Sequence, residues 1–322
     1  MQQANSSQSS SPPPELVNQR AAECARVVPD GFHAFVGALQ ARFGDSCQGV
    51  FLYGSCLHSY ELKDSVVDLY VLVDDYSRAY EGSFYRVLNR FVPPNVFYKE
   101  LEYEGNILRC KYGVISLEDF EKGATSWFHS YIWGRFSQPV RLLFARDDEV
   151  RHRIHQMLAS ATLTFLRASI PAIGRSNVDS ETIWTRGLAL SYEAELRPEN
   201  KNRARQLTHL NMGDYNRLTS LAATAIDELE ALPKDRYTCN VSEKACRRAL
   251  LKWRLRSWLG TLLSVLRLGK AVFTFKDCVD YAAWKIERHT GIQIEVTPKL
   301  QRHPLLFGWK VLWQLVRQGV MH

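Results

Sequence analysis

Two stretches decide the fold of this 322-residue chain: Gly49-Val-Phe-Leu-Tyr-Gly-Ser55 and Val66-Val-Asp-Leu-Tyr-Val-Leu-Val73. Each is a short apolar run with β-branched and aromatic residues, which predicts a buried strand. The first run ends in a Gly-Ser turn, and twelve residues separate Ser55 from Asp68 in the second run. The spacing therefore predicts two neighbouring strands, with a glycine turn at the end of one and an acidic residue on the other.

Such an arrangement suits a nucleoside triphosphate. Gly54 at a strand end lets backbone N–H groups approach phosphates, and the Ser55 hydroxyl can donate to a phosphate oxygen. The carboxylate of Asp68 on the adjacent strand can hold Mg²⁺ against the same triphosphate. Nucleotidyltransferases of the polymerase-β type have this layout, so we expect their mixed α/β sheet followed by a mainly helical second domain. An ordinary strand–loop turn with a surface acid explains these two short motifs equally well.

The expected metal site lacks one ligand in this chain. Nucleotidyltransferases of this type usually carry a second acid two residues after the first, on the same face of the strand. Tyr70 occupies that position. Asp74 shares the face of Asp68, but six residues of strand place it about 20 Å away. Glu100 and Glu102 are the nearest other candidates along the chain, so the expected metal ligands are Asp68, Glu100 and Glu102.

Further elements complete the expected α/β domain. Apolar residues recur at helical spacing over 29–42, and a second helix is expected at about 79–91. Strands near 96–103 and 107–115 flank Glu104-Gly-Asn106, a good hairpin turn because Gly and Asn tolerate positive φ. From about residue 117 most segments have a helical pattern. The expected parts are a disordered or extended N-terminus (1–28), the nucleotidyltransferase domain (29–150), a mainly helical lipid- or substrate-facing domain (151–296) and an amphipathic membrane-binding tail (297–322).

Two cations are candidates for contacts with a triphosphate. Along the strand 107–115, alternate apolar residues point to one side and Lys111 points to the other, beside the Gly54-Ser55 turn. An ammonium group in that place can neutralise phosphate charge. Arg135 can clamp a phosphate through two hydrogen bonds, although a structural ion pair explains it equally well. His58 lies close to the turn, where we expect an ordinary loop histidine.

An ordered series of motifs resembles one known family. The motifs are Tyr53-Gly-Ser55, Val67-Asp-Leu69, Lys111-Tyr-Gly-Val-Ile-Ser116, Tyr131-Ile-Trp-Gly-Arg135, Gln138-Pro-Val140 and Leu190-Ser-Tyr-Glu-Ala-Glu-Leu-Arg197. They are similar to those of the mitochondrial translocator assembly and maintenance family, whose members are CTP:phosphatidate cytidylyltransferases. The resemblance is densest over residues 50–145. Cys56, Gln138 and Glu195 stand where the family has Gly, Lys and Asp, which suggests a divergent, bacterial relative.

The resemblance implies a reaction and a set of site residues. The reaction is transfer of CMP from CTP to phosphatidate, giving CDP-diacylglycerol and diphosphate for cardiolipin or phosphatidylglycerol synthesis. Mg²⁺ is the expected cofactor, and no nucleic acid is expected as a partner. The expected residues are Asp68 and Lys111 for catalysis, Gly54, Ser55, Lys111 and Arg135 for CTP, and Glu195 and Arg197 for contacts with phosphatidate or with the second domain.

Basic charge is concentrated in the second half of the chain. Residues 1–160 carry 16 Lys/Arg and 19 Asp/Glu, a net charge of −3, whereas residues 161–322 carry 25 and 15, a net charge of +10. Segment 246–276 combines eight cations and no acid with leucines and Trp258 at helical spacing. The tail 297–322 is basic and rich in Leu and Trp. We expect peripheral association of the tail with an anionic membrane; a core-packed helix explains segment 246–276 equally well.

The expected location is the surface of a membrane. No run of about 18 apolar residues is present, so no segment is expected to span a bilayer. The surface would be the cytoplasmic face of the plasma membrane, or the matrix side of the mitochondrial inner membrane in a eukaryote. Seven scattered cysteines without a CxxC pair argue against a zinc site.

Two other functions stay open at this point. One is a nucleotidyltransferase that acts on RNA or on a small molecule, with the basic half of the chain binding phosphates. The other is an inactive, membrane-bound scaffold, which the missing second acid would explain.

Overall fold

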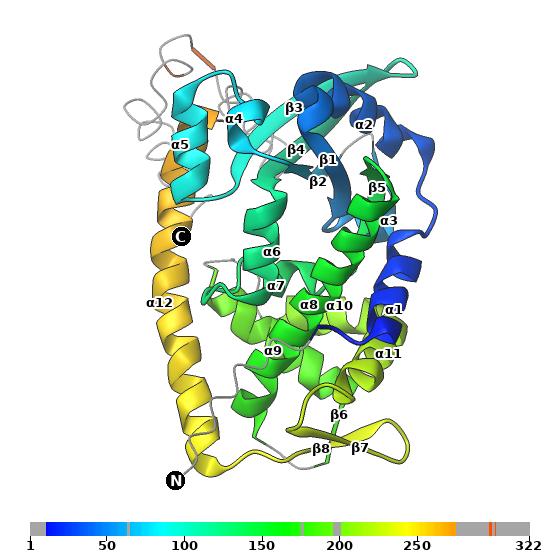
Figure 1. The fold of residues 1–322 in the computed structure, drawn as a ribbon, viewed down its shortest axis with the longest axis vertical. Coiled ribbons are helices and arrows are strands. Elements are labelled where there is room, and N and C mark those ends of the chain that lie inside the picture. Colours follow the sequence, from blue (N-terminus) through cyan, green and yellow to red (C-terminus); the bar gives the residue numbers. More distant parts are fainter. Residues whose placement is uncertain are drawn as a thin grey trace.

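The computed structural model describes residues 11–62, 65–174, 177–195 and 201–274, with Val296, Thr297 and Leu300 further on. A five-stranded sheet with helices on both faces forms one half of the molecule, and a mostly helical half follows it (Figure 1). The expected architecture of a mixed α/β sheet followed by helices is therefore confirmed. Apart from Thr297 and Leu300, the predicted tail 297–322 lies outside the described residues.

The central sheet is formed by β1 (Cys47–Tyr53), β2 (Val66–Val73), β3 (Asn95–Tyr103), β4 (Asn106–Ser116) and β5 (Arg141–Ala145). Their order is β3-β4-β2-β1-β5, with β2 and β4 parallel and the other neighbours antiparallel. The strands predicted near 50–53, 66–73 and 107–115 thus share one sheet, as expected. β5 was not predicted, because five residues on a sheet edge carry too short a pattern to separate from a loop.

Each face of the sheet has its own buried core. On one face, Phe35 and Leu39 of α2 (Asp30–Phe43) belong to a buried cluster with Leu69 of β2 and Tyr112 of β4. On the other face lie α6 (Leu117–Thr125), α7 (Trp133–Phe136) and α8 (Asp148–Ile173), and Tyr70 of β2 meets Phe136 with ring centres 4.9 Å apart. Residues two apart in a strand share a face, so Asp68 belongs to the face of Tyr70.

Short helices connect these strands. They are η1 (Gly44–Ser46), α3 (Cys56–Ser59), α4 (Tyr76–Ala79) and α5 (Ser83–Phe91). The helix predicted at 79–91 is confirmed as α5 but begins later, at Ser83, because the chain leaves helical geometry at Tyr80 after α4 and resumes it after Gly82.

The second half of the molecule is mainly helical. Its elements are α9 (Ser180–Glu193), α10 (Lys201–Leu210), α11 (Met212–Ala223), α12 (Glu243–Thr274) and a small sheet of β6 (Val178–Asp179), β7 (Leu229–Leu232) and β8 (Arg236–Cys239). Trp184 of α9 stacks on Tyr215 of α11 with ring centres 3.9 Å apart, and on Phe165 of α8 at 4.9 Å. The same buried cluster reaches the sheet through α8, so the two halves share one core.

The expectation of a disordered or extended N-terminus through residue 28 is wrong for its second half. Residues Pro14–Cys24 form helix α1, which begins with proline at its first position, where no hydrogen bond is lost. Leu16 is fully buried against α8 and α11, and Arg20 and Glu23 are fully buried as an ion pair. The polar composition of residues 1–14 concealed an amphipathic helix directly after it.

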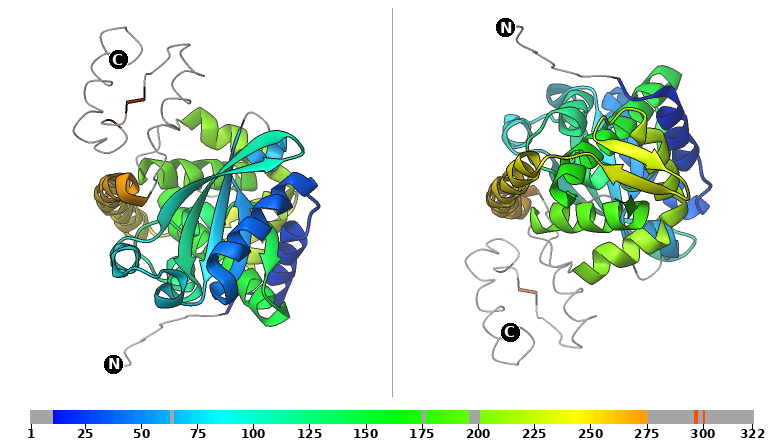
Figure 2. Two further views of the ribbon diagram at one scale, coloured as in Figure 1. Left: turned by 90° about the horizontal axis from the view of Figure 1, so that it is seen from above. Right: turned by 90° about the horizontal axis from the view of Figure 1, so that it is seen from below.

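Helix α12 runs along one side of the molecule and is seen nearly end-on in both views of Figure 2. Its inner side is anchored by Trp253, which is 3% exposed and donates from Nε1 to the carbonyl of Ala168 at 2.9 Å. Gly260 allows the helix to touch the end of α9, because a Cβ atom there would overlap the carbonyl oxygen of Ala194. Among the described residues, no helix has the length and apolarity needed to cross a membrane.

Candidate active site

The Gly-Ser turn lies directly against Asp68. β1 and β2 run antiparallel, and their register pairs Tyr53, the last residue of β1, with Asp68. Gly54 has a φ of +82°, a conformation that glycine adopts without steric cost. A Cβ atom at Gly54 would lie 2.8 Å from Oδ2 of Asp68. The turn therefore requires glycine both for its backbone conformation and for its close approach to this carboxylate.

Asp68 is ion-paired with Lys111 of the next strand. The parallel register of β2 and β4 places the two residues opposite each other, with Lys111 Nζ 3.0 Å from Asp68 Oδ1. The predicted alternation along β4 is confirmed, because Cys110 and Tyr112 are fully buried while the Lys111 side chain is 38% exposed. An anion entering from solvent can therefore reach this ammonium group.

Arg135 of α7 is held in place by three groups. It donates from Nη2 to Oε2 of Glu195 at 3.1 Å and from Nη1 to the hydroxyl of Tyr70 at 3.2 Å, and its guanidinium carbon lies 4.2 Å from the ring centre of Tyr131. Burial opposes the positive charge, but Tyr131, Tyr70 and Glu195 outweigh it and raise the pKa of Arg135 well above its ordinary value. Arg135 is therefore a permanently charged group with a defined orientation.

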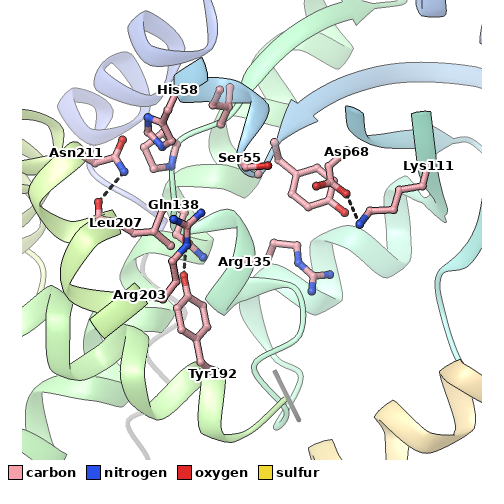
Figure 3. A pocket seen from close by; sticks show the side chains of 14 residues that line it. Ser55, His58, Asp68, Lys111, Arg135, Gln138, Tyr192, Arg203, Leu207 and Asn211 are labelled. Carbon is pink, nitrogen blue, oxygen red and sulfur yellow. Dashed lines mark hydrogen bonds and ion pairs between the residues drawn. The ribbon is translucent and has the colours of Figure 1, made fainter. Parts of the chain in front are cut away.

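These elements surround a pocket of about 400 Å³ between the sheet and the helical half (Figure 3). The predicted residues Gly54, Ser55, Asp68, Lys111 and Arg135 all line it. Asp68 is the one acidic side chain among the described lining residues, whereas Lys111, Arg135 and Arg203 supply positive charge. A cavity with this balance of charge suits a polyanion of nucleotide size.

The family of the chain follows from a comparison with known sequences. A family model described as mitochondrial phosphatidate cytidylyltransferase matches residues 74–253, more than half of the chain. The chain belongs to this family. The matched region includes Lys111, Arg135 and Glu195, while Gly54, Ser55 and Asp68 lie before it and are joined to it through the β1–β2–β4 register.

Membership establishes the chain as a phosphatidate cytidylyltransferase, a nucleotidyltransferase whose product is CDP-diacylglycerol, and confirms the family resemblance seen in the sequence. Among solved structures, the cytidylyltransferase is similar to a nucleotidyltransferase-like protein from Exiguobacterium sibiricum, determined at 1.90 Å resolution. The two are 13% identical, the match covers 90% of this chain and 92% of that chain, and the TM-score is 0.26. No curated protein matches the chain.

The helical wall of the pocket was not predicted. Tyr192 of α9 donates from its hydroxyl to Oε1 of Gln138 at 3.0 Å, and α10 contributes Arg203 and Leu207 (Figure 3). Tyr192 and Gln138 both belong to the family motifs in the sequence, but the hydrogen bond between them was not predicted. Arg203 carried no sequence signal, because one arginine in a basic helix has the appearance of a solvated surface residue.

His58 also lines the pocket, on the side of the Gly-Ser turn. Burial, with additional repulsion from Arg141 and Arg203, lowers the pKa of His58 below its ordinary value. At neutral pH the imidazole is therefore uncharged and contributes hydrogen bonding rather than positive charge.

Arg20 of α1 supports the loop that follows α7. Its Nη2 donates to the carbonyl oxygens of Phe136 and Gln138, both at 3.0 Å, and its Nη1 pairs with Oε2 of Glu23 at 2.6 Å. Helix α7 has only four residues, so these bonds satisfy carbonyls at its C-terminal end that would otherwise lack partners. The N-terminal helix thus stabilises the segment that carries Arg135 and Gln138.

Glu100 and Glu102 are not brought to Asp68, which corrects their expected role as metal ligands. β4 lies between β3 and β2, so a full strand separates both glutamates from Asp68. Glu100 faces Arg109 in the register and pairs with it at 3.0 Å, while Glu102 faces Ile107; neither lines the pocket. Within the described residues no group of three His, Cys, Asp or Glu side chains could hold a metal.

The second-domain contact expected of Glu195 is seen as its ion pair with Arg135, which joins the end of α9 to α7. Arg197, expected beside it, lies outside the described residues. Whether either residue contacts phosphatidate stays a prediction.

Proposed function

We propose that this pocket binds the triphosphate of CTP against the Gly54-Ser55 turn and directs the phosphate of a membrane-borne phosphatidate to the α-phosphorus. The observation that carries the proposal is the Asp68–Lys111 pair, 3.0 Å apart, facing a glycine whose φ of +82° disfavours any other residue. The turn offers backbone N–H groups and the Ser55 hydroxyl to phosphate oxygens. Lys111 and Arg135 supply the positive charge that a triphosphate requires.

The reaction needs positioning and charge stabilisation more than a base. An oxygen of the phosphatidate phosphate forms a bond to the α-phosphorus of CTP, and the bond from that phosphorus to the oxygen bridging to the β-phosphate breaks. Diphosphate leaves with the electron pair. A phosphate monoester is already an anion at neutral pH, so no proton has to be removed from the attacking oxygen. Negative charge that develops on the leaving diphosphate is stabilised by Lys111 and Arg135.

The donor set of the pocket fits a magnesium ion held jointly by protein and substrate. Mg²⁺ is commonly bound by one or two carboxylates together with substrate phosphates. Asp68 provides one carboxylate here, with its Oδ2 against Gly54 and its Oδ1 against Lys111. When bound, the ion would neutralise charge on the triphosphate. The ion pair with Lys111 orients this carboxylate.

Helix α12 supports peripheral association with an anionic membrane. Large apolar side chains on its outer side are exposed to solvent: Leu251, Leu255, Trp258, Leu262, Val265, Leu266, Leu268 and Phe273. Beside them its first turns expose Arg247, Arg248, Lys252 and Arg254, and no acid follows Glu243 in the helix. Exposed apolar area with neighbouring cations is the composition of a helix that lies in a membrane interface. The alternative of a core-packed helix leaves these leucines and Trp258 without buried partners.

The membrane in question is the one that contains phosphatidate. Lipid of this kind leaves a bilayer at a cost of roughly 0.8 kcal/mol per buried CH₂, so the enzyme has to work at the surface. We propose the matrix side of the mitochondrial inner membrane for a eukaryotic source and the cytoplasmic face of the plasma membrane for a bacterial one. The tail 297–322 would add to the binding by α12.

One assay tests the proposed function. Labelled CTP and Mg²⁺ are incubated with the protein and with either phosphatidate vesicles or an RNA 3′ end, and with ATP in place of CTP. We expect CDP-diacylglycerol from CTP and phosphatidate alone. Transfer to RNA, or comparable turnover with ATP, would refute the proposal.

A further inference from the structure

The inner side of α12 carries cations without acidic partners. Arg256, Arg267 and Lys270 are all partly or fully buried, and none forms an ion pair with a described acid. Lys270 donates to the carbonyl of Pro94 at 2.6 Å, and Arg256 donates to that of Phe128 at 2.8 Å. A buried cation is costly unless an anion accompanies it. This side of α12 is therefore suited to an anionic ligand.

Arg267 is the cation that connects to the active site. Its guanidinium carbon lies 3.6 Å from the ring centre of Tyr131, and its Nε donates to the carbonyl of Pro93 at 3.2 Å. Arg135 lies 4.2 Å from the same ring centre. Since both distances end at one point, the two guanidinium carbons are at most about 8 Å apart. One phosphate group can accept hydrogen bonds from two arginines at such a separation.

The terminal nitrogens of Arg267, unlike those of Arg135, donate to no described residue. Arg135 already directs Nη1 to Tyr70 and Nη2 to Glu195, whereas among described residues only Nε of Arg267 has a partner. His129, whose electrostatic neighbours include Arg267 and Glu195, has a buried Nδ1 without a hydrogen-bond partner within the described part of the chain. This ring nitrogen can therefore take part in a hydrogen bond with a ligand or a water molecule.

We infer that Arg267 binds the phosphate of phosphatidate next to Arg135, with which it shares the Tyr131 ring, outside the residues that line the pocket at the Gly54-Ser55 turn. The inference rests on the proposed function. Attacking and leaving oxygens lie roughly in line in phosphoryl transfer, so the acceptor phosphate needs a site away from the turn and Lys111. Phosphatidate stays anchored in the bilayer by its acyl chains. Helix α12 is the element that has apolar side chains exposed on one side and Arg267 beside Arg135 on the other.

The substitution Arg267→Gln tests the inference, with Arg151→Gln, an exposed arginine of α8 outside the pocket and outside α12, as its control. Steady-state kinetics are measured in mixed micelles of detergent and phosphatidate, which separates substrate recognition from vesicle binding. For Arg267→Gln we expect kcat/KM for phosphatidate to fall about 10- to 100-fold, as a lost charged hydrogen bond predicts. The KM for CTP should stay within about twofold, and Arg151→Gln should resemble the wild type.

Other outcomes are equally decisive. An unchanged kcat/KM for phosphatidate overturns the inference, and so does an equal loss of CTP binding, which would assign Arg267 to the triphosphate. If Arg267→Gln does not fold, Arg267→Lys takes its place. For Arg267→Lys, a KM for phosphatidate raised at least about threefold with an unchanged KM for CTP supports the inference, because lysine cannot form a two-pronged contact. An unchanged KM for phosphatidate overturns it. A wild-type protein that makes no CDP-diacylglycerol would remove the proposed function itself.

Discussion

The two walls of the pocket are built on different principles. On the strand wall, the turn, Asp68 and Lys111 take their positions from the backbone ladder, because register alone sets Asp68 opposite both Tyr53 and Lys111. On the helical wall, positions depend on contacts between side chains, such as that of Tyr192 with Gln138. A ladder of many hydrogen bonds holds a carboxylate more rigidly than one contact between side chains can. This difference is consistent with the proposal that the strand wall binds the triphosphate.

The strongest test of this division is Asp68→Asn. The amide keeps the size of the side chain but loses its charge, so a metal-bound triphosphate loses its carboxylate ligand and Lys111 loses its partner. We expect kcat to fall at least about a thousandfold, since several kcal/mol of charge stabilisation are removed. Circular dichroism and thermal unfolding should show a folded protein, because the Asp68 side chain is partly exposed.

Asp74→Asn is the control for that experiment. Asp74 follows the same strand, pairs with Arg78 and lies outside the active-site pocket. Its substitution should leave kcat within about twofold, as an exposed ion pair contributes little. Near-normal turnover by Asp68→Asn would show that the strand wall does not hold the metal.

A second test addresses the turn. In Gly54→Ala the new methyl group would meet Oδ2 of Asp68 and force the backbone out of its φ of +82°. We expect kcat/KM for CTP to fall about a hundredfold, the size of effect produced by a displacement of about 1 Å at a reacting group. Gly105→Ala is the matched control, because Gly105 has a φ of +70° with open space around it. If both variants lose activity equally, backbone strain rather than contact with Asp68 is responsible.

The strand wall could be predicted from sequence and the helical wall could not, for a physical reason. Strand periodicity and a glycine turn connect Gly54, Ser55, Asp68 and Lys111 by local rules, and the structure brings these residues together as expected. Glu100 was wrongly predicted to lie beside Asp68 because nearness along the chain does not reveal strand order. Strand β4 lies between Glu100 and Asp68. Arg203 and Arg267 reach their places through packing of helices distant in sequence. The family resemblance supplied the activity, which no local pattern contains.

A third test changes the outer side of α12, which we propose binds the membrane that carries the lipid acceptor. Trp258 and Leu262 are 79% and 49% exposed. In the double variant Trp258→Ser, Leu262→Ser we expect vesicle association to weaken roughly thirtyfold, from lost apolar area of a few kcal/mol. Turnover of a short-chain, water-soluble phosphatidate should be retained. Co-sedimentation with anionic vesicles measures the first quantity, and Val27→Ser, an exposed apolar residue outside α12, is the control.

The smallest expected effect concerns the pH dependence of the helical side. Burial, reinforced by Arg267, lowers the pKa of His129 to about 4, against about 6.5 in an unfolded chain. Between these values the unfolded chain binds a proton that the folded protein does not, so stability increases with pH across this window. His129 therefore costs the fold at most about 3 kcal/mol as pH falls from 6.5 to 4. His155, with a pKa of about 4 that also results mainly from burial, acts in the same window.

Urea unfolding at pH 4.5 and pH 7 measures this contribution. The free energy of unfolding should fall from pH 7 to pH 4.5 in both proteins. Because glutamine cannot take up the proton, the fall should be about 2 kcal/mol smaller in His129→Gln than in the wild type. His152→Gln, on the exposed side of α8, is the control. An identical decrease in wild type and His129→Gln would contradict the lowered pKa of His129. A smaller decrease in His129→Gln would show that acid destabilises the region around His129, because the proton is taken up close to Arg267, where a second positive charge is unfavourable.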